Sequence, residues 1–421
     1  MSEPNADQAE SLDVVIVGAG IVGLAAAWKL VEAGRRVLLI DREGVAQGAS
    51  FGNAGALAYS DILPIASMGM VGRVPGWLMD PLGPLAIPPG YLPQIAPWLL
   101  RFWRAGWPDR TKASIAAQSA LMHLSEREMH GVVAAAGLQD RVRSDGSLEL
   151  HESEREFKAS LPGWQKRDEA GIAYRHVRGA ELAEMQPGLS PRFVAGTFVP
   201  SWQVVSDPYD FAVALSDRLT ARGAVIRIAA ATAVRPVDGG VAIDLQGGET
   251  LRARQAVIAA GAWSKALSQP LGDKIPLETE RGYNTTLPAD AFDVRLQLIF
   301  VAHGFVITPL SSGLRVGGAV ELGGLKRPPN YKRADAMLEK ATRFLPGLKR
   351  EGGRQWMGFR PSLPDTLPAI GVSRASPNIV YAFGHGHLGL TQSAGTGRLV
   401  ADLVCGHEPA IDMRPFRPDR F

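Results

Sequence analysis

The sequence has almost no cysteine and no long apolar run. Its only cysteine, Cys405, cannot form an internal disulfide or supply a zinc cluster, so the fold must rest on packing and a reducing compartment is expected. No run of about 18 consecutive apolar residues occurs, which excludes a membrane-spanning helix. Residues 1–11 are polar and lack a basic segment, so we expect a disordered tail, no secretion signal and a cytoplasmic protein.

Neither sign of charge dominates. The 45 Lys and Arg residues nearly balance the 42 Asp and Glu residues, and no long basic run occurs, so a nucleic-acid partner is not expected. A chain of 421 residues with 46% apolar residues is typical of a globular protein of two or three domains. Its 47 glycines indicate tight turns and close backbone approaches.

A buried strand, a glycine-rich turn and a helix follow one another near the N-terminus. Residues 13–17 are a short β-branched run, as in a strand with both faces covered. The turn that follows consists of Gly18, Ala19, Gly20, Ile21, Val22 and Gly23. In such a motif Gly18 allows the tight turn, Gly20 lets the backbone approach a pyrophosphate, and Gly23 lets the helix pack on the strand. The pattern predicts a dinucleotide site at the helix N-terminus.

The next elements complete that motif. The helix is predicted over 21–33 with Gly34 at its end, and a second strand over 36–40 carries Asp41 at its tip. Asp41 would bind a ribose diol and disfavours a cofactor with a 2′-phosphate, but it does not separate NAD from FAD.

Two later segments repeat the junction of a strand with glycines. A helix over 206–222, with Ser206 or Asp207 as N-cap, precedes strands and the buried run 256–264. Near the C-terminus a strand, a glycine loop at 384–389 and a helix over 391–404 follow one another. Three such junctions scattered along the chain indicate an elongated cofactor, FAD, bound by a domain assembled from separate segments.

Together, six segments resemble the D-amino-acid oxidase superfamily, and in particular bacterial D-amino-acid dehydrogenases. They are GAGIVG at 18–23, GASFGNAG at 48–55, SDP at 206–208, AAGAWS at 259–264, MGFRPSLPDTLPAIG at 357–371 and GHGHLGLT at 384–391. The resemblance extends over residues 12 to about 412. It implies an α/β Rossmann-like FAD-binding domain with a discontinuous parallel sheet, and an α+β substrate domain with an antiparallel sheet. The expected FAD-binding segments are 12–61, 204–267 and 354–421, and the substrate-domain segments are 62–203 and 268–353.

The resemblance also implies site residues. Arg360 would pair with a substrate carboxylate, as suits a guanidinium fork, and Asn53 would lie near the flavin. Tyr283 would either place its phenol over the ligand or pack in the core, and these three are the expected catalytic residues. The residues expected to contact FAD are Gly18, Ala19, Gly20, Ile21, Val22, Gly23, Asp41, Arg42, Ser50, Asn53, Gly55, Val234, Ala260, Gly261, Gly386, His387, Gly389, Leu390 and Thr391.

His385 and His387 lie two residues apart, which suggests a metal site at first sight. No Cys, Asp or Glu lies near enough in sequence to complete a ligand set, so we expect no metal. We also expect non-covalent FAD, because no Cys or His lies where relatives attach the flavin.

The activity implied by the resemblance is oxidative deamination of D-amino acids by hydride transfer to flavin N5, with cyclic imino acids such as D-proline or a hydroxyproline as a particular case. A quinone would accept the electrons. Two alternatives stay open, namely a glycine- or sarcosine-type oxidase that uses oxygen, and a flavin-binding subunit of a larger complex.

The segment 61–108 is more apolar than a surface linker and contains many prolines. The prolines exclude one long helix, although residues 98–105 could form a short interfacial helix whose Arg101 and Arg104 suit lipid headgroups. The segment would either contact a membrane or quinone, as on the inner face of a membrane, or pack against the substrate domain or a dimer partner.

Overall fold

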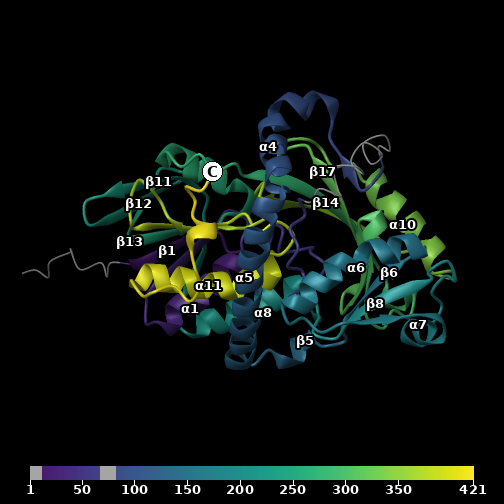
Figure 1. Cartoon of the computed structure of the whole chain (residues 1–421). Coiled ribbons are helices and arrows are strands. Elements are labelled where there is room, and N and C mark those ends of the chain that lie inside the picture. The colour runs from purple at the N-terminus through teal and green to yellow at the C-terminus, as the bar shows by residue number, and fades with distance from the viewer. Residues whose placement is uncertain (1–11, 67–81) are drawn as a thin grey trace, which may run out of the picture.

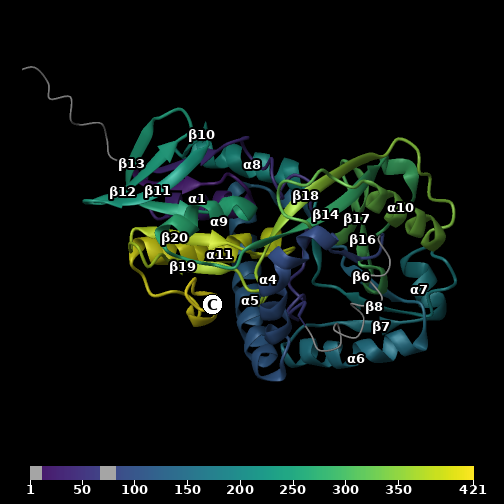
Figure 2. The same cartoon turned by 90° about the horizontal axis from the view of Figure 1, so that it is seen from above.

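The computed structural model describes residues 12–66 and 82–421, so the predicted tail at 1–11 lies outside the described residues. Two large sheets lie on either side of the helix α5 (Pro108–Ala136), as both views show (Figures 1 and 2). The strands of the first sheet are β1 (Leu12–Val17), β2 (Val37–Asp41), β10 (Val225–Ile228), β11 (Ala231–Val237), β12 (Gly240–Leu245), β13 (Thr250–Ile258), β19 (Ala369–Val372) and β20 (Ile379–Phe383).

The first sheet is built around parallel strands from distant parts of the chain. Strand β1 pairs in parallel with β2 and β13, while β10 pairs with β2 and β20 pairs with β13. Val14 and Ile16 face a core formed with the helices, and Val15 and Val17 face a second core formed with β11 and β12. Both faces of β1 are covered, which explains why residues 14–17 after Asp13 are all apolar.

Helices cover one face of this sheet. They are α1 (Ile21–Glu32), α8 (Pro208–Ala221) and α11 (Gly389–Cys405), with α5 packed on α11. The packing is close where glycines face neighbours, since a Cβ on Gly397 would lie 2.5 Å from the carbonyl oxygen of Ala25. A Cβ on Gly395 would lie 2.3 Å from the Ser125 hydroxyl oxygen on α5. The helix α11 is therefore held between α1 and α5, and its N-terminus has a fixed place.

The second sheet runs in the order β18-β14-β17-β16-β15-β6-β8-β7, and β4 also pairs with β17. Its pairs are antiparallel except β15–β6 and β17–β4, which are parallel. Its strands are β4 (Leu85–Ala86), β6 (Ser147–His151), β7 (Arg175–Val177), β8 (Ala195–Val199), β14 (Glu278–Leu287), β15 (Gln297–Phe300), β16 (Phe305–Leu310), β17 (Gly313–Leu322) and β18 (Arg354–Ser362). In its core the ring of Phe305 stacks on the rings of Phe300 and Phe344, which are tilted relative to each other.

Smaller elements connect these layers. A three-stranded sheet joins β3 (Ala56–Leu57), β9 (Gln203–Val205) and β5 (Val142–Arg143). The remaining α-helices described are α4 (Leu92–Ala105), α6 (Glu154–Glu169), α7 (Gly179–Met185), α9 (Ser264–Ser268) and α10 (Lys332–Phe344). Short 3-10 helices lie at Pro89–Tyr91, Gln139–Arg141, Gly261–Trp263, Gln269–Leu271, Ala289–Ala291, Val301–His303 and Arg414–Phe416.

Helix α4 begins at Leu92, earlier than the predicted start at residue 98. Pro93 is tolerated in the first turn, where its missing N–H has no helical partner. Pro97 lies inside the helix, which continues because Ile95 and Trp98 are buried against Leu322 of β17. Residues 67–81 of the predicted membrane-contact segment lie outside the described residues.

Both predicted sheets are present, which confirms the predicted fold class of a discontinuous, mainly parallel sheet plus an antiparallel sheet. The division of the chain at 61, 203, 267 and 353 stays a prediction. Within the predicted segment 354–421, β18 pairs with β14 of the second sheet, whereas β19 and β20 belong to the first.

Candidate active site

A cavity of about 1030 Å³ lies between the two sheets. Its walls include the carboxyl ends of β1, β2, β13 and β20 and parts of β14, β17 and β18. The predicted residues that line it are Gly18, Gly20, Ile21, Val22, Asp41, Arg42, Ser50, Asn53, Ala260, Gly261, Tyr283, Arg360, Gly386, His387, Gly389, Leu390 and Thr391. The fold thus brings together segments that are hundreds of residues apart. Four predicted residues, Ala19, Gly23, Gly55 and Val234, do not line the cavity.

The glycine turn after β1 has the geometry that its sequence predicts. Gly18 adopts a φ of +115°, and a Cβ there would lie 2.4 Å from the carbonyl oxygen of Ala259. A Cβ on Gly23 would lie 1.9 Å from the carbonyl oxygen of Gly18, so Gly23 acts by packing the helix on the turn. The Ser50 hydroxyl accepts a hydrogen bond from the Ile21 N–H at 3.0 Å. Gly20, Ile21 and Val22, at the start of α1, all line the cavity.

Asp41 is fixed by backbone donors at the end of β2. Its carboxylate accepts hydrogen bonds from the N–H groups of Ala19 at 2.9 Å, Glu43 at 2.9 Å and Gly44 at 3.2 Å. Ala19 therefore orients Asp41 and does not itself line the cavity. Val234 lies on β11 and its side chain is buried in a core of the first sheet, which explains why it lies away from the cavity surface.

An aromatic residue that the sequence analysis missed lies near Asp41. The guanidinium of Arg42 lies 3.6 Å above the ring centroid of Trp263, whose ring meets that of Phe359 at 5.5 Å. All three residues line the cavity. Trp263 belongs to the AAGAWS segment that was recognised in the sequence. Of this segment, only Ala260 and Gly261 were predicted to contact FAD.

The paired strands β14 and β18 form the wall at the other end of the cavity. In this register Glu280 is opposite Arg360, Gly282 is opposite Gly358, and Asn284 is opposite Trp356. Because side chains alternate along a strand, these six residues lie on one face, and all six line the cavity.

Glycines in the middle of this wall make room for two flat groups. A Cβ on Gly282 would lie 2.3 Å from the Cζ atom of Arg360. A Cβ on Gly358 would lie 2.0 Å from the ring of Trp356, and one on Gly52 would lie 2.4 Å from it. The guanidinium and the indole therefore lie against glycine backbone.

Two backbone carbonyls of β17 hold Arg360. Its Nη1 donates to the carbonyl oxygen of Ala319 at 2.8 Å, and its Nη2 donates to that of Gly318 at 3.5 Å. Burial lowers the pKa of Arg360, and the nearby charge of Glu280 opposes this effect. A guanidinium has five N–H donors, so others are left for a planar anion such as a carboxylate.

Tyr283 follows Gly282 on β14, and its ring packs in the core of the second sheet. Its hydroxyl donates to a carboxylate oxygen of Glu321 and accepts from the N–H of Asn330 at 3.1 Å. Burial raises the pKa of Tyr283. Tyr283 lines the cavity, but its hydroxyl is engaged in this buried network, which also includes Arg281 at 3.3 Å from Glu321.

Asn53 shapes the loop between β2 and β3. Its side chain donates to the carbonyl of Ser50 at 3.2 Å and accepts from the N–H of Gly55 at 2.8 Å. Arg315 of β17 donates to the Asn53 carbonyl at 2.6 Å and lies 3.4 Å from Asp207, the N-cap of α8. The loop is thus bonded to elements of both sheets. Gly55 forms part of the turn in this loop and does not line the cavity.

The two histidines of the loop after β20 have separate partners. His385 is buried, its Nε2 lies 2.9 Å from the Thr396 hydroxyl, and burial lowers its pKa to about 3. His387 lies 3.0 Å from Asp61. Burial alone would raise the pKa of Asp61, but His387 and Arg167 lower it below its ordinary value. Among residues 12–66 and 82–421, no three His, Cys, Asp or Glu side chains gather as metal ligands.

Several cavity residues were not assigned to the site from the sequence, although some of them lie in the quoted motifs. They are Gly52, Asp61, Trp202, Trp263, Glu280, Asn284, Gln297, Trp356 and Gly358, among others. The alternation E-R-G-Y-N beside W-M-G-F-R could have placed Glu280 and Trp356 on the face of Arg360, provided that the register of the two strands had been known.

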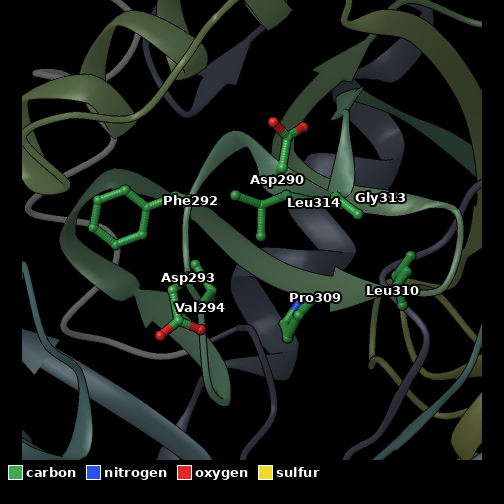
Figure 3. Close-up of a pocket in the computed structure, with 9 residues that line it drawn as sticks. Asp290, Phe292, Asp293, Val294, Pro309, Leu310, Gly313 and Leu314 are labelled. Carbon is green, nitrogen blue, oxygen red and sulfur yellow. The ribbon is translucent and has the colours of Figure 1, made fainter.

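A second cavity, of about 330 Å³, lies at the far end of β14 and β17. Its wall is mainly backbone and apolar side chains, and the carboxylates of Asp290 and Asp293 point in opposite directions (Figure 3). Asp290 pairs with Lys349 at 3.0 Å. This cavity has no converging polar groups that would form a catalytic site.

Comparison with known proteins agrees with this geometry. Residues 13–403 match the family described as FAD dependent oxidoreductase, DAO. A D-amino-acid oxidase of Bradyrhizobium diazoefficiens is 39% identical over 98% of this chain and 99% of its own length. A D-amino acid dehydrogenase of Paramagnetospirillum magneticum is 31% identical over 97% of this chain and 99% of its own length.

The fold is also that of a solved structure. Glycine oxidase from Geobacillus kaustophilus has a TM-score of 0.78 to this chain at 24% identity, over 97% of this chain and 98% of its own. The resemblance inferred from the six segments is confirmed, and the chain belongs to the DAO family of FAD-dependent oxidoreductases.

Proposed function

We propose that the protein oxidises the Cα–N bond of D-amino acids and that Arg360 binds the carboxylate of the substrate. The observation that carries this proposal is the placement of Arg360, a half-buried guanidinium on the wall of a cavity that ends at the nucleotide motif. The names of the two relatives, a D-amino-acid oxidase and a D-amino acid dehydrogenase, support this substrate class.

The residues of the cavity fit FAD, which we expect to bind without a covalent link. The turn at Gly18 and Gly20 would hold the pyrophosphate, Asp41 the ribose, and Asn53 with the start of α11 at Gly389 the flavin. No cysteine of the described chain lines the cavity. When bound, FAD accepts the hydride that leaves the α-carbon of the substrate.

The chain itself contributes orientation. Arg360 holds the carboxylate in one position, which limits the directions in which the α-carbon can point. The amine must be neutral when the hydride leaves, so a substrate that is bound as the ammonium first releases one proton to water. The nitrogen lone pair then forms the C=N bond as the α-hydrogen leaves with its electron pair. Water then adds to the imine and releases ammonia and a 2-oxo acid. No base is needed at the α-carbon.

Cyclic imino acids such as D-proline and hydroxyprolines fall within the same proposal. Their secondary amine can also form a C=N bond. Trp202, Ile299 and Val306 line the cavity with apolar side chains, which would suit a ring.

For the electron acceptor we propose a quinone at the cytoplasmic side of a membrane. On helix α4 Leu100 is 66% exposed and Trp103 is 46% exposed, next to the exposed Arg101. Apolar side chains with an arginine between them are typical of helices that lie on a lipid surface. No described helix is long and apolar enough to cross a bilayer. Sedimentation with phosphatidylglycerol vesicles tests this contact, and loss of binding in a Leu100→Ser, Trp103→Ser variant is the expected result.

Anaerobic addition of candidate substrates to the yellow holoenzyme tests the function. D-amino acids or D-proline are expected to bleach the flavin, and a quinone analogue is expected to restore the colour faster than air. Bleaching by glycine or sarcosine alone, with peroxide formed in air, would favour an amine oxidase. A flavin that no substrate bleaches would favour a flavin-binding subunit.

The variant Arg360→Ala tests the anchor. It is expected to raise the KM for D-amino acids by about a hundredfold or more, because a charged substrate group loses its partner. Arg360→Lys keeps the positive charge but lacks the planar guanidinium, so its KM should rise less than that of Arg360→Ala. A matched change of the exposed Arg350 to Ala should leave the KM unchanged. Unchanged turnover in Arg360→Ala would refute the assignment.

A further inference from the structure

A buried carboxylate lies beside Arg360 in the same cavity. Glu280 is 8% exposed, and it is the residue opposite Arg360 in the register of β14 and β18. Residues in such a pair have Cβ atoms about 5 Å apart on the same face of the sheet. The cavity wall therefore carries one negative and one positive side chain as direct neighbours.

These two side chains do not form an ion pair with each other. The guanidinium of Arg360 is turned along the strand, over Gly282, and is bound by the carbonyls of Gly318 and Ala319. Within the described chain, Glu280 has neither a hydrogen bond nor a salt bridge, although its charge acts on Arg360. By contrast, Glu278 on the same strand accepts a hydrogen bond from Tyr91 at 3.0 Å.

An unpartnered carboxylate that is nine-tenths buried is costly unless a cation completes it. The cation opposite Glu280, Arg360, has its guanidinium over Gly282 and donates to carbonyls of β17. An α-amino acid carries a carboxylate and an ammonium on one carbon atom, so its two charges match a positive and a negative group that are side by side. Both Glu280 and Arg360 line the cavity, so a ligand in the cavity has access to both.

We propose that Glu280 binds the α-ammonium group of the substrate while Arg360 binds its carboxylate. This inference rests on the proposed function. It adds that the site recognises the zwitterion as a unit, and that Glu280 is a specificity-determining residue that rejects carboxylates without an amino group.

The test compares two ligands that share a carboxylate. D-Alanine has the α-ammonium, and propionate has a hydrogen atom in its place. The Kd of D-alanine is obtained from the concentration dependence of anaerobic flavin reduction, and the Kd of propionate from its perturbation of the flavin spectrum. Both are measured on the holoenzyme and on the variants Glu280→Gln, Glu280→Asp and Glu278→Gln.

Glu280→Gln is expected to raise the Kd of D-alanine by about tenfold to a hundredfold, as for loss of a charged hydrogen-bond partner. The Kd of propionate should stay the same or fall, because a negative neighbour of Arg360 is gone. Glu280→Asp should lie between the wild type and Glu280→Gln, and Glu278→Gln should leave both ligands unchanged.

Equal weakening of both ligands in Glu280→Gln would overturn the proposal, because it would indicate a structural role. D-Lysine is measured in the same way as a third ligand. A Kd raised for D-lysine and unchanged for D-alanine would also overturn the proposal, since Glu280 would then bind a side-chain ammonium. Failure of the proposed function gives a different result, namely a wild-type flavin that D-amino acids do not bleach and propionate does not perturb.

Discussion

At the scale of single residues, the site depends on which positions lack a side chain. Gly282 is two residues from Glu280 on β14, and the guanidinium of Arg360 lies in the space that a Cβ of residue 282 would take. The sequence named Arg360 from its motif, but the need for Gly282 follows only from the contact between the two strands.

Gly282→Ala is therefore expected to displace the Arg360 guanidinium, since its Cβ would lie 2.3 Å from Cζ. We expect the KM for D-amino acids to rise at least about tenfold, which corresponds to about 1.4 kcal/mol, while the visible spectrum of bound FAD is kept. Gly131→Ala on α5, where a Cβ would meet nothing within 4 Å, is the control. A KM equal to that of the wild type would show that Arg360 does not need this position.

His385 gives a prediction for stability against pH. Its folded pKa is about 3, whereas an unfolded histidine titrates near 6.5. Between these values the unfolded chain binds the extra proton, so the free energy of unfolding falls as the pH falls from about 6.5 towards 3.

His385 lowers the free energy of unfolding by at most about 1.4 kcal/mol for each pH unit of this fall. His385→Gln is expected to flatten the slope measured by urea unfolding between pH 6.5 and pH 4.5. An identical slope in the variant and the wild type would mean that His385 titrates normally in the folded protein.

At the scale of elements, the sequence predicted types well and boundaries less well. The N-cap of α8 is Asp207, one of the two predicted residues, because its carboxylate accepts from the N–H groups of Tyr209 and Asp210. The first helix ends at Glu32, and Gly34 with a φ of +75° follows it as its stop. Helix α4 starts earlier than predicted because burial of Ile95 compensates for two prolines, which a local pattern does not reveal.

The contact between α1 and α11 gives a stability prediction. Gly397→Ala would place a Cβ 2.5 Å from the Ala25 carbonyl oxygen, and this neighbour is backbone that cannot rotate away. We expect a loss of about 1–3 kcal/mol in the free energy of unfolding. Gly131→Ala, which faces open space on a helix, is expected to gain about 0.5–1 kcal/mol. Equal effects of the two changes would refute close packing at Gly397.

At the scale of the whole molecule, one cavity joins the two sheets. The expected cofactor would touch segments from Gly18 to Thr391, so its binding would link parts of the chain that belong to both sheets. A ligand that binds only the folded state stabilises it by an amount that grows with its concentration.

Added FAD is therefore expected to raise the Tm of the apoprotein. At a free FAD concentration of a hundred to a thousand times the Kd, the free energy of unfolding should rise by about 3–4 kcal/mol. Acid or heat denaturation followed by filtration should release all the yellow colour from the holoenzyme. Colour that stays with the denatured chain would contradict non-covalent binding.

By itself the sequence determined the nucleotide motif, the family and the two kinds of sheet, and it singled out Arg360 as the residue expected to bind a carboxylate. Each of these depends on residues close together in the chain, or on motifs that keep their meaning in any member of the family. The neighbours of Arg360 were decided by the tertiary structure. Glu280 lies opposite it only because β14 and β18 pair in one register, and a shift by one residue would turn Glu280 to the other face.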